Sequence, residues 1–278
     1  MSNLSKKSFL NSPFRSIKHT NYFHAYDHFF SKYRNEEITF VEIGVLAGGS
    51  LFMWRDFFGP KARIIGIDVH PNAKKWEAEG FEIFIGSQSD ESFWSDFKKK
   101  VNNIDIVLDD GGHTYEQQIV TVESLLEAMN DNGIIVTEDT NTSYEVNYGP
   151  VSYSFINYVK NRIDAVNRRF KFKPDCLQQG LSNNNNEKRF YSIEIVDSMV
   201  AFKINREASY SESEVIDNEG KDDLVSHINY GEDFTKPMFR LPQIIFWLLK
   251  LFPFYKSAVR FTKEAISKKN FSAKKYFK

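Results

Sequence analysis

The sequence predicts an α/β fold: a doubly wound, mostly parallel sheet of seven strands. Between residues 36 and 140, five short apolar runs alternate with four amphipathic segments, which is the pattern of right-handed β-α-β crossovers. A glycine-rich turn follows the first run, where such sheets bind nucleotide-like ligands. Two more apolar runs, 189–196 and 199–204, predict a hairpin that completes the sheet.

Each predicted element is bounded by residues that turn or cap the chain. In chain order, the parallel strands are the apolar runs 40–44, 64–68, 81–85, 104–108 and 134–137. The helices, which place apolar residues on one face, are 50–58, 73–79, 91–101, 115–129 and 152–169. Gly59-Pro60 stops the first of these helices, and the polar run 130–133 stops the fourth.

Four regions are expected along the chain. Residues 1–35 place aromatic residues and histidines at helix-like spacing, which predicts an amphipathic helical lid that packs on the sheet or covers a pocket. The sheet domain spans 36–206, an acidic loop spans 207–235, and a basic, aromatic, helical tail spans 236–278. The tail has eleven Lys and Arg against one acid. It therefore contacts an anionic membrane surface or packs as an arm in a homo-oligomer.

Composition and charge exclude several classes of protein. The net charge is −1, so no excess of positive charge would attract nucleic acid. The single cysteine excludes an internal disulfide and a cysteine-based metal site, which agrees with a reducing cytoplasm. The N-terminus lacks the apolar core of a signal peptide, and no stretch reaches the roughly 18 apolar residues of a membrane span. We therefore expect a cytoplasmic protein, which would be peripheral at the inner membrane if the tail contacts the membrane and not a second copy of the chain.

The glycine-rich turn favours S-adenosylmethionine over a dinucleotide. Its pattern, E-x-G-x-x-x-G-G-S from Glu42 to Ser50, departs from the G-x-G-x-x-G fingerprint that contacts a pyrophosphate. Glu42 would repel a pyrophosphate, but it could accept a hydrogen bond from the ammonium group of an amino-acid moiety. Gly44 and Gly48 would let the backbone approach that ligand. The alternative is that the glycines only make a tight turn.

The ends of the next two strands supply further candidate contacts for a cofactor. Asp68 closes the second strand, where two carboxylate oxygens suit the vicinal hydroxyls of a ribose; its alternative role is to cap a helix. Gln88 lies in the turn 86–90 after the third strand, where short polar groups could contact an adenine. The same residues could equally form an ordinary turn.

Carboxylates gather at the ends of the fourth and fifth strands. Asp109 and Asp110 end one strand, and Glu138 and Asp139 end the other. Four carboxylates at one sheet edge would repel one another unless a cation lay between them, and oxygen ligands suit Mg²⁺ or Ca²⁺. His113 follows across two glycines and could act as a general base on a hydroxyl group. The alternative, that the acids cap two helices, explains one acid per strand.

These motifs resemble those of the Mg²⁺-dependent sugar O-methyltransferases, a class I family that uses S-adenosylmethionine. The motifs are VEIGVLAGGS, IDVHP, GSQSD, LDDGGH and VTEDT, and the resemblance covers residues 16–148. It implies metal ligands at Asp110, Glu138 and Asp139 and a base at His113. It also implies an N-terminal segment that closes over the cofactor. The candidate cofactor contacts are Glu42, Gly44, Gly48, Ser50, Asp68, Gln88, Asp109, Lys18 and Tyr22. Ser87 departs from the family pattern, in which an acid is expected.

The sequence thus predicts an enzyme that methylates a sugar hydroxyl with S-adenosylmethionine and Mg²⁺. The expected acceptor is a heptose or deoxysugar of a capsule, a lipopolysaccharide or a glycosylated metabolite, linked to a nucleotide or a polymer. Three alternatives stay open: a catechol-type methyltransferase, an NAD-dependent oxidoreductase, and a non-enzymatic, membrane-associated assembly factor.

Overall fold

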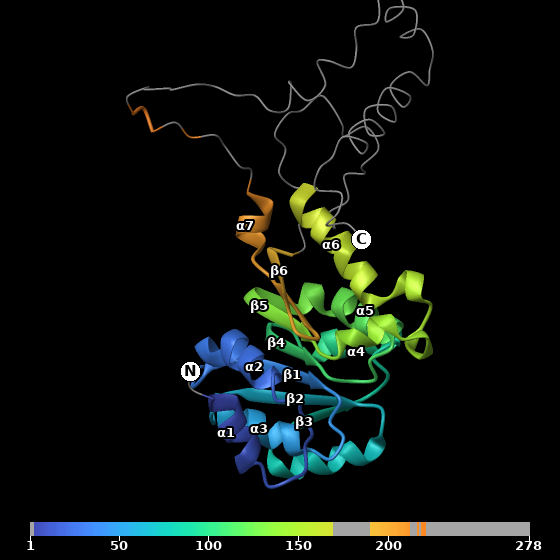
Figure 1. The fold of residues 1–278 in the computed structure, drawn as a ribbon. Helices are drawn as coiled ribbons and strands as arrows, with labels where there is room; N and C mark the ends of the chain where they lie inside the picture. The colour runs from blue at the N-terminus through green and yellow to red at the C-terminus, as the bar shows by residue number, and fades with distance from the viewer. Residues whose placement is uncertain (1–2, 169–189, 212–215, 217, 221–278) are drawn as a thin grey trace, which may run out of the picture. The chain divides into compact units, whose positions relative to one another are not determined.

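The structure is a computed structural model that describes residues 3–168, 190–211, 216 and 218–220. These residues form a seven-stranded sheet in the order β3-β2-β1-β4-β5-β7-β6 (Figure 1). The strands are β1 Thr39–Ile43, β2 Arg63–Asp68, β3 Glu82–Ile85, β4 Ile104–Asp109, β5 Met129–Thr137, β6 Ser192–Val196 and β7 Met199–Lys203. β1 to β5 pair in parallel, whereas β7 pairs antiparallel with β5 and β6. The predicted doubly wound, mostly parallel sheet is confirmed.

Helices cover both faces of the sheet. The α-helices are α1 Leu4–Asn11, α2 Tyr22–Phe30, α3 Gly49–Phe58, α4 Glu91–Lys100, α5 Tyr115–Leu125, α6 Phe155–Arg168 and α7 Arg206–Tyr210. Short 3-10 helices are η1 Ser31–Tyr33, η2 Pro71–Glu79, η3 Leu126–Ala128, η4 Thr140–Tyr144, η5 Val146–Tyr148 and η6 Val151–Tyr153. One apolar core joins the sheet to α2, α3 and η2, and the other joins it to α4, α5 and α6.

The largest errors in the predicted boundaries lie on either side of residue 129, next to the polar run 130–133. The fourth helix was expected to reach residue 129, but α5 ends at Leu125 and η3 continues to Ala128. The polar run 130–133 was expected to be a turn, but it lies inside β5. The register there shifts, because Ile104 pairs with Met129 while Ile106 pairs with Ile134. The extra residues are therefore accommodated as an irregularity in the strand pairing.

The N-terminal region is divided between the apolar core and a strap. Tyr26 and Phe30 of α2 are fully buried against α3 and the sheet, so this helix packs on the sheet, while its first residue, Tyr22, also lines a small cavity. Between α1 and α2, residues 12–21 have no regular secondary structure; we call them the connecting strap. The strap reaches the carboxyl edge of the sheet through Lys18, and α2 reaches it through Tyr22 and Tyr26.

Contacts divide the chain into residues 1–214 and residues 215–278. Most of the predicted acidic loop, the whole predicted tail 236–278 and Cys176 lie outside the described residues. Among the residues that the structure does describe, no helix combines the length and the apolar character needed to cross a membrane. The membrane and oligomer interpretations of the tail therefore stay predictions.

Candidate functional site

A cavity of about 370 Å³ opens at the carboxyl ends of β1, β2 and β4. This edge is where parallel α/β sheets bind their ligands. Four of the predicted cofactor contacts line the cavity directly: Gly44, Ser50, Asp68 and Gln88. Strap residues 15–17 and the segment 110–113 complete its wall. The cavity thus joins the glycine-rich turn to the segment that carries Asp110 and His113.

Two glycines allow close backbone contacts around this cavity. Gly44 has a φ of +92°, and a Cβ at that position would lie 2.1 Å from the carbonyl oxygen of Asp110. A Cβ on Gly49 would lie 2.4 Å from the carbonyl oxygen of Phe14 in the strap. Only residues without a side chain permit these approaches. Gly44 therefore brings the ends of β1 and β4 together, and Gly49 lets the strap lie on the turn.

Asp68 organises the glycine-rich turn as well as lining the cavity. Its Oδ2 accepts hydrogen bonds from the backbone N–H groups of Val45 and Leu46, both at 3.0 Å, and its Oδ1 accepts one from His70 at 2.8 Å. The cap of η2 is His70, whose ring nitrogen accepts from Asn72. Asp68 is therefore not the helix cap that was considered as its alternative role, and its carboxylate is fixed at the cavity wall.

Glu42 lies behind the turn, where it is fully buried. Its carboxylate accepts hydrogen bonds from Ser50 Oγ at 2.8 Å and Trp54 Nε1 at 3.0 Å. It is not among the residues that line the cavity, so its predicted contact with a cofactor ammonium stays a prediction. Burial raises the pKa of Glu42 to about 7.

This raised pKa predicts a pH-dependent stability. As pH rises from about 4.5 to 7, Glu42 ionises in the unfolded chain before it ionises in the folded one, so the free energy of unfolding falls. The loss in the free energy of unfolding amounts to about 3 kcal/mol, because a difference of one unit in pKa corresponds to about 1.36 kcal/mol. Urea unfolding at pH 5 and pH 8 should show a smaller difference in Glu42→Gln than in the wild type. The exposed control Glu36→Gln should behave as wild type; an unchanged difference in Glu42→Gln would contradict the assignment.

Gln88 connects the cavity wall to the segment that follows β4. Its amide nitrogen donates to Asp109 Oδ1 at 2.9 Å and to Thr121 Oγ1 at 3.2 Å, and its oxygen accepts from the backbone N–H of Gly112 at 2.9 Å. Asp109 is buried beneath this contact, and burial raises its pKa to about 7. Both residues hold the turn between Asp110 and His113 in place. Gln88 also lines the cavity, whereas Asp109 does not, and their predicted contacts with the cofactor stay predictions.

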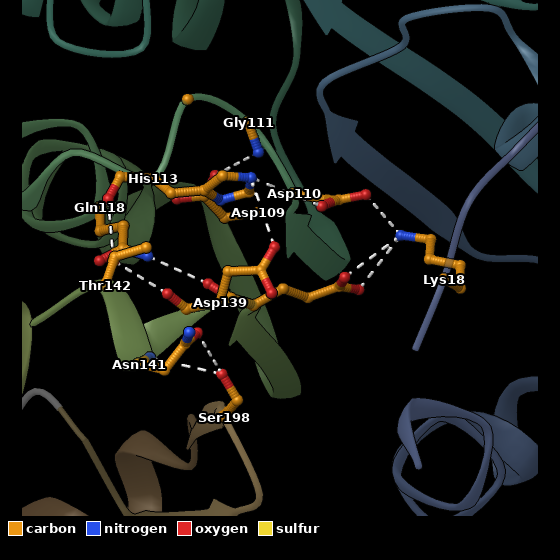
Figure 2. A network of polar contacts seen from close by, with 12 residues as sticks. Lys18, Asp109, Asp110, Gly111, His113, Gln118, Asp139, Asn141, Thr142 and Ser198 are labelled. Atoms are coloured by element: carbon orange, nitrogen blue, oxygen red, sulfur yellow. Dashed lines mark hydrogen bonds and ion pairs between the residues drawn. The ribbon is translucent and has the colours of Figure 1, made fainter. Parts of the chain in front are cut away.

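The remaining acids meet the strap and His113 at the edge of the sheet (Figure 2). Lys18 donates to Asp110 Oδ2 at 2.5 Å and to Glu138 Oε2 at 3.2 Å. His113 Nε2 lies 3.4 Å from Asp139 Oδ2 and 4.0 Å from Asp110 Oδ1. Tyr22, which was predicted to contact the cofactor, donates its hydroxyl to Asp139 at 2.6 Å. Lys18 and Tyr22 thus both reach the acid cluster.

The backbone directs His113 and Asp139 towards each other. Both residues have left-handed conformations, with φ values of +58° and +52°, which cost free energy in residues other than glycine. Thr142 links the two segments, because its hydroxyl is 2.9 Å from the carbonyl oxygen of Asp139 and 3.1 Å from that of His113. The strained conformations are therefore held by contacts on both sides of the site.

Helix capping does not account for these acids. Thr114 caps α5 through a reciprocal pair of hydrogen bonds with Gln117, so neither Asp109 nor Asp110 is needed there. Asp139 precedes η4 but makes no side-chain capping hydrogen bond. The capping alternative is therefore wrong for the acids of both strands.

Sequence patterns missed three residues that support the site. Tyr26 donates its hydroxyl to Glu138 at 2.6 Å, and Gln118 donates to the backbone carbonyl of Glu138 at 3.0 Å. Thr142 is the third. For Tyr26 a signal existed, since it follows Tyr22 by four residues and so lies on the same helix face. No local pattern marked Gln118 or Thr142.

The side chains present fit a divalent metal ion. Ligand atoms of Asp110, His113 and Asp139 all lie within 4.8 Å of one another, and carboxylate oxygens are the ligands that Mg²⁺ prefers. Glu138 is close to Asp110 through their shared contact with Lys18, but it is outside this group. The cluster can therefore hold a cation between side chains that include the imidazole of His113.

Comparison with known proteins agrees with this architecture. Residues 41–140 match the family model of a methyltransferase domain. The MycE methyltransferase of the mycinamycin biosynthetic pathway, solved in complex with Mg and SAH, superposes with a TM-score of 0.64 and 24% identity. The match covers 76% of this chain and 55% of that one. The chain has the class I methyltransferase fold.

Matches to curated relatives confirm the predicted resemblance to the sugar O-methyltransferases. The match to an 8-demethyl-8-alpha-L-rhamnosyl tetracenomycin-C 2'-O-methyltransferase of Streptomyces olivaceus is 29% identical and covers 51% of this chain and 40% of that protein. The match to demethylmacrocin O-methyltransferase of Streptomyces fradiae is 30% identical and covers 51% and 38%. The matched region thus spans about two fifths of each relative's length.

Proposed function

We propose that the chain is an O-methyltransferase that uses S-adenosylmethionine and Mg²⁺ to methylate a sugar hydroxyl. The observation that carries the proposal is the position of the acid cluster. Asp110 and His113 line the cavity at the glycine-rich turn, and both approach Asp139 within the possible metal-ligand group. A methyl donor and a metal-ligating group would therefore share one wall, as a transfer reaction requires.

A second, smaller cavity suits the acceptor. It has a volume of about 180 Å³ and is lined by residues of the strap, by Tyr22 and by the acid cluster. Asp110 belongs to both cavities, so a hydroxyl in the smaller one would lie next to the methyl donor in the larger one. Polar side chains at fixed positions would orient that hydroxyl, and orientation supplies much of the rate of such reactions.

In this proposal each residue has a distinct task. Asp110, Glu138 and Asp139 would hold the metal ion, which, when bound, makes an acceptor hydroxyl more acidic. His113 would take the hydroxyl proton at Nε2, the nitrogen that faces Asp139. Gln88 and Thr142 would hold the segments that follow β4 and β5 in fixed positions relative to each other. The finer identity of the acceptor, a heptose or deoxysugar of a capsule, lipopolysaccharide or glycosylated metabolite, is part of the proposal. The similarity to the methyltransferase of a rhamnosyl tetracenomycin supports a glycosidic deoxysugar.

A transfer assay tests the proposed reaction. The full chain is incubated with S-adenosylmethionine, Mg²⁺ and a panel of nucleotide sugars, glycosides and catechols, and the products are weighed by mass spectrometry. Gain of one methyl group on a sugar supports the proposal. Methylation of catechols alone would favour the catechol-type alternative, and no methylation of any acceptor, with tight binding of NADH, would favour the oxidoreductase.

We predict that Asp68→Ala weakens binding of S-adenosylhomocysteine by roughly 10–100-fold. The reason is that a hydrogen bond to a charged group contributes about 1.5–3 kcal/mol, and the carboxylate also orders the turn. Calorimetry of the ligand-free protein measures the change. Asp68→Asn, which keeps one oxygen acceptor, should lose less, and Glu77→Ala on the exposed part of η2 should lose nothing. Equal affinity in wild type and Asp68→Ala would contradict the assignment.

A further inference from the structure

Lys18 places a positive charge inside the acid cluster. Its side chain is 2% exposed, although most of the neighbouring strap residues are exposed. Its ammonium contacts Asp110 and Glu138 and lies 5.6 Å from the centre of the Tyr26 ring. Lys18 is therefore a resident cation of the site.

The same residue holds the middle of the strap. At one end, Ser12 Oγ donates to the carbonyl of Gly49 at 2.7 Å, and Phe14 packs edge-on against Trp76 at 4.5 Å between ring centres. At the other end, Asn21 donates to Asp197 at 2.5 Å. Within the described chain, no backbone-to-backbone hydrogen bond involves residues 13–18. The ion pairs of Lys18 are thus the main polar attachment between these ends.

This arrangement separates the proposed metal ligands into two groups. Asp110 and Glu138 face the Lys18 ammonium, whereas Asp139 faces His113 and Tyr22. In the described residues, the group able to hold an ion contains Asp110, His113 and Asp139 but omits Glu138. A divalent ion that gathered Asp110, Glu138 and Asp139 would need the carboxylate oxygens that Lys18 contacts. Two cations so close together would repel each other strongly.

We propose that Lys18 and the divalent ion compete for Asp110 and Glu138, so that metal binding releases Lys18 and loosens the strap beside the methyl-donor cavity. The inference rests on the proposed function, since it assumes a metal at the acid cluster. Its consequence is that metal binding and access to the methyl-donor cavity are linked. Strap residues 15–17 line the methyl-donor cavity and Lys18 lies in the acid cluster, so metal occupancy would change access to the donor.

Calorimetry with Mn²⁺ or Mg²⁺ tests the competition without any turnover. Lys18→Met keeps an unbranched side chain of similar length but removes the charge, so the metal should bind more tightly, by roughly tenfold, which lies within the range usual for coupled sites. Lys74→Met is the matched control, because Lys74 carries the same charge on the surface, paired with Glu77. It should bind metal as the wild type does.

A second variant guards against misfolding of the first. Lys18→Arg keeps the charge and can bind carboxylates through two nitrogens, so metal should bind more weakly than in the wild type. Tighter binding in Lys18→Met or weaker binding in Lys18→Arg supports the competition. If all variants bind the metal equally, the competition is wrong while the metal site stands. If neither the wild type nor the variants bind a divalent ion, the metal part of the proposed function fails, and the competition with it.

Trypsin cleavage after Arg15 tests the movement of the strap. Arg15 is exposed and lies three residues before Lys18, so release of Lys18 should make this bond more accessible. In the wild type, Mg²⁺ should speed the cleavage, as measured by mass spectrometry of the N-terminal peptides. In Lys18→Met, cleavage should be fast with or without metal. A cleavage rate that metal leaves unchanged in the wild type would overturn the proposed loosening of the strap.

Discussion

Replacing His113 with Ala should lower kcat by about 10²–10⁴-fold, the usual contribution of a positioned general base. His113 Nε2 points into the acid cluster, 3.4 Å from Asp139, and among the described residues no other histidine lies in the group that could hold a metal. Binding of S-adenosylhomocysteine should stay close to wild type, because His113 is not among the residues predicted to contact the cofactor. Single-turnover kinetics and calorimetry separate the two effects.

The conformation of His113 calls for a second variant. Its φ of +58° is tolerated better by Asn than by Ala, so His113→Asn removes the imidazole with less change to the backbone. Both variants should lose rate to a similar extent if the imidazole itself is needed. His24→Ala, on the exposed face of α2, is the control and should keep full activity. A fast His113→Asn enzyme would show that the proton leaves by another route.

Removal of divalent ions should reduce turnover by at least about 10³-fold, because Lewis-acid stabilisation contributes several kcal/mol. Added Mg²⁺ should restore the rate after EDTA treatment. Asp139→Asn should raise the Mg²⁺ concentration needed for half-maximal activity, since the variant loses one charged ligand of the group that includes Asp110 and His113. Steady-state assays across a range of Mg²⁺ concentrations measure both effects.

A matched surface change controls for general electrostatics. Asp96→Asn removes an acid that pairs with Lys99 on the exposed face of α4, and its dependence on Mg²⁺ should equal that of the wild type. Full activity in the presence of chelator would contradict a metal requirement. In that case the Lys18 ammonium would be the cation that neutralises Asp110 and Glu138.

The fold could be predicted because its signals are local. The strands β1 to β4 and the second half of β5 are built on short apolar runs, and the turns between the strands contain glycine, proline or polar residues. The polar run 130–133 was misinterpreted because pairing with β4 decides its structure, and pairing partners are distant in the sequence. Periodicity also could not distinguish η2 from a regular helix over 73–79.

The sequence predicted which residues form the site better than it predicted the contacts between them. Asp110, His113 and Asp139 were expected to converge because the carboxyl ends of neighbouring parallel strands share an edge. The contacts of Lys18 could not be foreseen, since they span 92 residues to Asp110 and 120 to Glu138. Likewise, no pattern separated a carboxylate that faces the cavity from one behind it, as Glu42 is.

The packing of α2 has a consequence for any attempt to dissect the protein. The matched methyltransferase segment begins at residue 41, and a fragment cut at that boundary would seem complete by sequence comparison. Such a fragment would expose the sheet face that α2 covers with Phe23, Tyr26, Phe29 and Phe30, a patch prone to aggregation. It would also leave Glu138 without the hydroxyl of Tyr26 and the ammonium of Lys18. Screens of truncated variants should therefore keep the residues from Leu4 onward.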